Sequence, residues 1–151
     1  MISLKYIPAI TLFGGLFVFS SCMKDETATS DTPSLSIESV SKTELKEFKD
    51  SLIVTIRYED GNGDLGQVNP DSNYLLIRDA RLSKADYYHI KPLNPKGDGE
   101  IKMSGTLNVK LYSLFILGSN DNEKTTLSFR IKDRAGHWSN TVNTPILTIS
   151  R

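Results

Sequence analysis

The sequence predicts an all-β domain, folded as an antiparallel sandwich of about seven strands. Apolar and polar residues alternate along several segments, which is the period of a strand with one buried face. Clusters of Gly, Asn, Asp and Pro separate these segments and are typical of turns. Evidence for helix is limited to residues 41–49 and 83–86, where one or two turns fit but no long apolar stripe exists.

The expected strands follow one another at short intervals. The clearest is 127–132, in which Leu127, Phe129 and Ile131 alternate with polar residues. Pro145 makes the last segment an edge strand or one with a bulge. This number and spacing of strands favours an immunoglobulin-like sandwich, with a small barrel or jelly roll as the alternative. The expected strands are 35–40, 52–58, 74–78, 87–90, 101–111, 127–132 and 142–149.

Composition excludes several classes of protein. A length of 151 residues allows one domain and a tail. The chain has 18 basic and 18 acidic residues, whereas a nucleic-acid-binding domain usually carries a basic surplus, so we expect no nucleic-acid partner. A single cysteine, Cys22, rules out an internal disulfide and a cysteine-based zinc site.

Residues 1–21 have the organisation of an export signal. Lys5 precedes an apolar stretch, 7–19, that is shorter than the roughly 20 residues of a membrane-spanning helix. The segment Phe19-Ser20-Ser21-Cys22 resembles a bacterial lipobox. That resemblance implies cleavage before Cys22, a diacylglycerol on its thiol and a lipid anchor in the outer membrane. The alternative is an ordinary secretory signal followed by an incidental cysteine.

The charged residues after Cys22 indicate whether the protein lies on the cell surface or faces the periplasm. Lys24, Asp25 and Glu26 resemble the surface-export signal of Bacteroidetes-type lipoproteins, which implies a position on the cell surface. The alternative is a solvated tether on a protein that faces the periplasm. Residues 27–33 are polar and without periodicity, so we expect a lipidated cysteine and flexible tether over 22–33, with the sandwich domain at 34–151.

The loop after the second expected strand predicts a cation site. Asp60, Asn62 and Asp64 alternate with Gly61 and Gly63, and the glycines allow the backbone to curl so that the side-chain oxygens converge. Ca²⁺ takes six to eight oxygen ligands. The pattern resembles the start of several calcium loops, although it lacks their downstream Glu. The alternative is a tight turn closed by its own hydrogen bonds.

A second loop, 133–140, follows the strand at 127–132. In a Greek-key sandwich the two loops emerge at the same end, so Asp133 is expected to join Asp60, Asn62 and Asp64 around one structural Ca²⁺. The segment 96–99, Lys-Gly-Asp-Gly, is expected near the same end.

Together, segments 60–66 and 133–140 resemble a family of uncharacterised Bacteroidetes-type lipoproteins with an immunoglobulin-like domain. In that family Asn is commoner at the position of His137. The resemblance implies a fold and a location, and it carries no established activity.

The sequence does not predict an enzyme. Asp133, His137 and Ser139 contain the atoms of a catalytic triad, but all lie in one short turn. We therefore expect a structural or accessory lipoprotein, attached to the membrane through Cys22.

The alternative function is a surface module that binds a glycan or a protein partner. Tyr87 and Tyr88 point to opposite faces of an extended segment, so one of them is expected in the core and the other at the surface. Further candidate contacts are Tyr112, Phe115 and Trp138.

Overall fold

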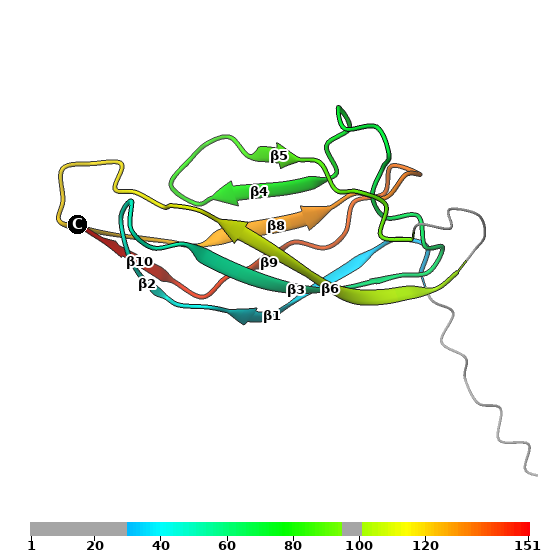
Figure 1. Ribbon diagram of the computed structural model, residues 1–151, viewed down its shortest axis with the longest axis horizontal. Helices are drawn as coiled ribbons and strands as arrows, with labels where there is room; N and C mark the ends of the chain where they lie inside the picture. Colours follow the sequence, from blue (N-terminus) through cyan, green and yellow to red (C-terminus); the bar gives the residue numbers. More distant parts are fainter. Residues whose placement is uncertain (1–29, 95–100) are drawn as a thin grey trace, which may run out of the picture.

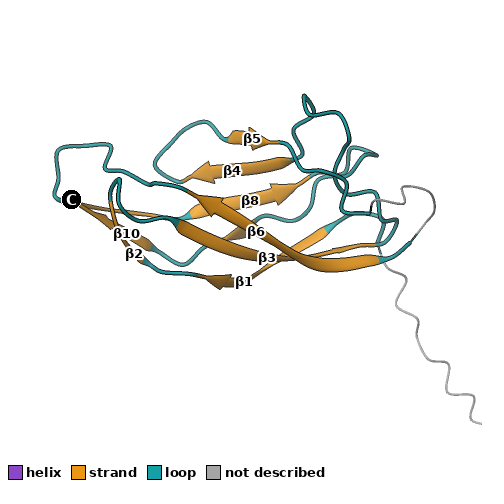
Figure 2. Cartoon of the chain, in the orientation of Figure 1, coloured by secondary structure: helices purple, strands orange, loops and turns teal. Residues whose placement is uncertain are grey.

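A computed structural model describes residues 30–94 and 101–151. This part of the chain consists of strands and loops, with no helix among the described residues (Figure 2), so the predicted all-β class is confirmed. The strands are β1 (Ser34–Val40), β2 (Glu44–Lys46), β3 (Leu52–Asp60), β4 (Leu75–Asp79), β5 (Asp86–Tyr88), β6 (Met103–Leu111), β7 (Asn122–Thr125), β8 (Leu127–Ile131), β9 (Val142–Asn143) and β10 (Leu147–Ser150).

The strands form two layers. One layer is the sheet β1-β3-β6, and the other contains β5-β4-β8-β9. The sheet β2-β10-β7 extends this second layer, because only Thr126 separates β7 from β8 and only residues 144–146 separate β9 from β10. The Thr144 amide donates to the Leu127 carbonyl across this junction at 3.0 Å. All strand pairs are antiparallel except β2 with β10 (Figure 1).

The hydrophobic core lies between the layers, as the alternation predicted. Leu52, Val54 and Ile56 of β3 are buried, while the residues between them are partly or fully exposed. On the opposing layer Leu127, Phe129 and Ile131 of β8 are buried, and Phe129 is completely enclosed. Each of these strands therefore contributes every second side chain to the core.

The helical turns allowed for at 41–49 and 83–86 are not present, and two strands were not predicted. Residues 44–46 form β2, which runs parallel to β10 and buries Leu45. β7 is the other addition and pairs with β10. Neither segment shows apolar alternation, and their pairing with a distant strand determines their conformation. In the last segment, residues around Pro145 interrupt the strand, in agreement with the expected irregularity.

One end of the sandwich gathers the start of the described chain and the two loops of interest (Figure 1, right), and the C-terminus lies at the other end. The Gly61 amide donates to the Ser30 carbonyl at 3.1 Å. Asn140 exchanges two hydrogen bonds with the Leu35 backbone, at 2.8 and 2.9 Å. Both loops are thus fixed to the segment that enters the domain.

Some expectations concern residues that lie outside the described part of the chain. These are the export signal, Cys22, the charged residues 24–26 and the segment 96–99. Within the described residues, no helix has the length and apolar character needed to cross a bilayer.

Candidate metal site

Asp60 and Asp133 reach the same end of the core because each continues the alternation of its strand. Asp60 is the next inward position after Tyr58 in β3, and Asp133 is the next after Ile131 at the end of β8. Both side chains are completely buried. The inward face of each layer therefore ends in a carboxylate where the core would otherwise take an apolar residue.

The first loop folds back onto Asp60. The Asp64 amide donates to Asp60 Oδ2 at 2.9 Å. Gly63 adopts φ +67°, and a Cβ at this position would lie 2.4 Å from the carbonyl oxygen of Ile101. Only glycine fits this close approach, and it allows the chain to turn back toward Asp60 within the loop.

Among the residues that the structure describes, three buried side-chain oxygens of this loop have no hydrogen-bond partner. They are the Oδ1 atoms of Asp60, Asn62 and Asp64. They are also the only buried unpartnered side-chain atoms found in the described part of the chain. Buried polar atoms in proteins are nearly always paired, and an unpaired one costs about 1–3 kcal/mol. Three such atoms at alternate positions of one loop form a set of oxygens that can accept hydrogen bonds or ligate a cation.

The second loop docks directly on the first. Leu65 and Asp133 form an isolated antiparallel bridge. The carbonyl oxygen of Asp64 accepts hydrogen bonds from the Arg134 amide, at 3.2 Å, and from Arg134 Nε, at 3.1 Å. The Ala135 amide donates to Asp64 Oδ2 at 3.1 Å. The predicted meeting of the two loops is thus observed, and Asp64 is the residue that joins them.

Asp133 differs from the other three residues of the predicted set. Its Oδ1 accepts a hydrogen bond from the His137 amide at 2.7 Å, and its Oδ2 lies 2.9 Å from His137 Nδ1. Both oxygens are therefore used within the second loop. Asp133 contributes negative charge to the site, whereas the unpartnered oxygens all belong to the first loop.

The carboxylates of Asp60, Asp64 and Asp133 repel one another. Burial is the main cause that raises the pKa of Asp60 to about 6, and the carboxylates of Asp64 and Asp133 act in the same direction. Burial also raises the pKa of Asp64, with Asp133 adding to the effect, while Arg134 opposes it. Burial and the neighbouring carboxylates therefore make ionisation of Asp60 and Asp64 less favourable than it is in water.

The triad-like residues of the second loop are not arranged as a triad. His137 is paired with Asp133, but Ser139 Oγ donates to the Asn140 carbonyl at 2.8 Å and accepts from the Ile131 amide at 3.0 Å. Ser139 is also buried, with 2% of its surface exposed. Its hydroxyl closes the end of β8 and is not directed to a base.

The donor set at this end is mixed. In the part of the chain that the structure describes, no three His, Cys, Asp or Glu side chains form a metal-binding group by themselves. The three unpartnered oxygens come from two carboxylates and one amide.

Comparison of the chain with family models, with curated proteins and with solved structures finds no match.

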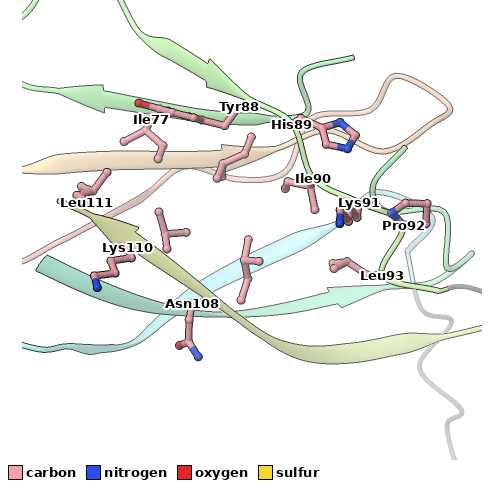
Figure 3. Close-up of a pocket in the computed structure, with 13 residues that line it drawn as sticks. Ile77, Tyr88, His89, Ile90, Lys91, Pro92, Leu93, Asn108, Lys110 and Leu111 are labelled. Carbon is pink, nitrogen blue, oxygen red and sulfur yellow. The ribbon is translucent and has the colours of Figure 1, made fainter. Parts of the chain in front are cut away.

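A second feature is an apolar hollow of about 400 Å³ between β6 and the β4–β5 edge (Figure 3). Leu75, Ile77 and Val109 line it, and Tyr88 and His89 lie at its upper side. His89 Nδ1 lies 3.0 Å from the Ser72 carbonyl. The hollow exists because β5 and β6 are both edge strands that do not pair with each other.

The aromatic residues expected as surface contacts fall into two groups, because Tyr88, Tyr112 and Phe115 line one hollow that does not include Tyr87 or Trp138. Tyr87 packs edge-on against Trp138 with ring centroids 6.4 Å apart. Phe115 stacks on Phe48 at 5.8 Å. The expectation that one of Tyr87 and Tyr88 is in the core is wrong: both are exposed, at 52% and 43%, because β5 is a short edge strand.

Proposed function

We propose that the chain is a lipid-anchored protein of the bacterial outer membrane, with a non-catalytic immunoglobulin-like domain in a structural or accessory role. The observation that carries the proposal is the position of Cys22, the only cysteine. It follows an apolar leader and two small residues and precedes a polar tether. Two acyl chains or more are needed for stable anchoring, and a lipidated N-terminal cysteine supplies them.

The arrangement of strands supports the immunoglobulin-like part of this proposal. One layer has the order β1-β3-β6, and the other joins β5-β4-β8-β9 with β2-β10-β7. The parallel pairing of β2 with β10 carries the first segment of the chain from one layer to the other. A first strand divided between two Greek-key layers suits an immunoglobulin-like sandwich better than a closed barrel.

One observation favours a structural role over catalysis. Ser139 is turned away from His137, so the triad-like residues act as turn-closing groups. The alternative, a module that binds a glycan or a protein partner, is supported by Tyr88, Tyr112 and Phe115, which are exposed and line one hollow.

The lipid anchor predicts a clear result for Cys22→Ser. The full chain, expressed in a bacterium that processes lipoproteins, should fractionate with the outer membrane, and the variant should lose this association and remain unprocessed. Ser21→Ala is the matched control, since alanine is also small and leaves the cysteine in place. Mass spectrometry should show the added acyl chains in wild type and control. Equal membrane association of wild type and Cys22→Ser would contradict the anchor.

The surface location has its own test. Protease added to intact cells should degrade the wild-type protein, whereas replacing Lys24, Asp25 and Glu26 together by alanine should protect it while leaving it in the membrane. Replacement of Thr27, Thr29 and Ser30 by alanine is the control for changes elsewhere in the tether. Protection of the wild-type protein would instead indicate that the domain faces the periplasm.

A further inference from the structure

We propose that Asp60, Asn62 and Asp64 bind one calcium ion, and that this ion braces the end of the domain where the tether enters. The proposal rests on the geometry of the described residues and does not depend on the lipid anchor. The proposed ligand set differs from the one that the sequence suggested, because Asp133 is no longer a ligand. Both of its oxygens contact His137 within the second loop, and it acts on the site through its negative charge.

The first argument is the chemistry of the unpartnered atoms. All three are oxygens, two from carboxylates and one from an amide, and none accepts a hydrogen bond from residues 30–94 or 101–151. A turn closed by its own hydrogen bonds would have used these atoms, as it uses Asp60 Oδ2 for the Asp64 amide. Oxygen ligands of this kind are preferred by Ca²⁺ and not by zinc, which favours nitrogen and sulfur.

The negative charge at this end of the core also favours a bound cation. Asp60, Asp64 and Asp133 place three carboxylates at one end of the core, and Arg134 is the basic residue that acts on Asp64 there. Two of these aspartates, Asp60 and Asp133, are completely buried. Burying carboxylates close together is unfavourable unless a cation or proton compensates them. A divalent cation at the three Oδ1 atoms would compensate the charge and occupy the unpartnered oxygens at once.

The third argument concerns which divalent cation fits. Three protein oxygens from one short loop leave several coordination positions to water or backbone carbonyls. Ca²⁺ accepts six to eight ligands in flexible geometry, whereas Mg²⁺ requires a near-ideal octahedron and loses its water reluctantly. A short, partly buried set that includes an amide therefore favours Ca²⁺. Extracellular modules bind it at roughly 10⁻⁴–10⁻³ M.

Asp64 and Gly61 would link the ion to the second loop and to the start of the described chain. Asp64 offers Oδ1 to the ion while its Oδ2 and its carbonyl oxygen hold the second loop. Gly61 donates to the Ser30 carbonyl, at the start of the described chain. Ordering of residues 60–64 by the ion should thus stabilise both loops and the attachment of the tether.

The test uses the full chain purified in detergent. Calcium binding is measured by isothermal titration calorimetry, and the effect of calcium on Tm is measured by thermal unfolding. Wild type should bind one Ca²⁺ and gain at least about 3 °C in Tm at saturation, with a much smaller effect of Mg²⁺. Asn62→Ala removes one ligand without changing charge and should weaken binding on the order of tenfold. Asn62→Asp adds a charged ligand and should tighten it.

Asp71→Asn is the matched control, because Asp71 lies in the same long loop but is exposed. Its affinity for Ca²⁺ should equal that of wild type. The proposal is overturned if wild type shows neither heat nor a change in Tm up to about 10 mM Ca²⁺, well above the expected affinity. It is equally overturned if Asp71→Asn weakens binding as much as Asn62→Ala, or if Asn62→Asp fails to tighten it.

Discussion

Gly66→Ala is expected to lower the free energy of unfolding by about 2–5 kcal/mol. Gly66 has φ +81°, a conformation that costs an L-residue roughly 1–2 kcal/mol. A Cβ at this position would also lie 2.2 Å from the carbonyl oxygen of Lys91 and 3.0 Å from Pro92 Cα. Since these neighbours are backbone atoms, the segment after β5 must move away, which adds about 1–3 kcal/mol. Urea unfolding followed by circular dichroism measures the change.

Gly136→Ala separates the two contributions. Gly136 also has a positive φ, +97°, but a Cβ there would meet nothing within 4 Å. This variant should lose only about 1–2 kcal/mol, the cost of the backbone conformation. Equal losses in the two variants would contradict the close approach of Gly66 to the backbone of Lys91 and Pro92.

In the presence of a chelator, protonation of Asp60 is expected to raise the free energy of unfolding as the pH falls from 7.5 to 4. Asp60 has a pKa of about 6 in the folded protein against 3.8 in the unfolded chain, so folding takes up a proton between these values. Its contribution is fully present below pH 3.8 and is lost as the pH rises through 6. A difference of this size corresponds to about 3 kcal/mol. Urea unfolding in chelator at several pH values gives the profile.

Asp60→Asn isolates this contribution from those of other carboxylates. The amide group introduced by the substitution does not ionise, and its oxygen can still accept a hydrogen bond from the Asp64 amide. Asp50, Asp79 and Glu123 have lowered pKa values and act in the opposite direction, but they are common to both proteins. The difference between wild type and variant should therefore grow in favour of the variant as pH rises from 4 to 7.5. A flat difference would contradict an ionisable, buried Asp60.

The strands that sequence could predict are those whose own residues alternate. β3 and β8 bury apolar side chains at every second position, so periodicity alone reveals their location and their inward face. β2 and β7 could not be found in this way. Leu45 is the only buried apolar residue of β2, and its strand exists because Thr148 to Ser150 of β10 pair with it. Such pairing depends on the tertiary fold and leaves little trace in a local pattern.

The site was predictable in part for the same reason. The alternate spacing of Asp60, Asn62 and Asp64 is visible in the sequence, and the phase of each strand places Asp60 and Asp133 on the core side. The sequence does not reveal that His137 takes both oxygens of Asp133, nor that the second loop binds Asp64. These contacts depend on how the second loop turns after β8, and they distinguish the oxygens that are used from those that remain unpartnered.

The most direct test of the account is a crystal structure of the protein grown with about 10 mM CaCl₂, a concentration above the expected affinity. One ion is expected at the tether end of the sandwich, with the Oδ1 atoms of Asp60, Asn62 and Asp64 about 2.3–2.6 Å from it. This expectation would be contradicted by a structure from such crystals in which these three oxygens accept ordinary hydrogen bonds from neighbouring groups or water and no ion lies between them.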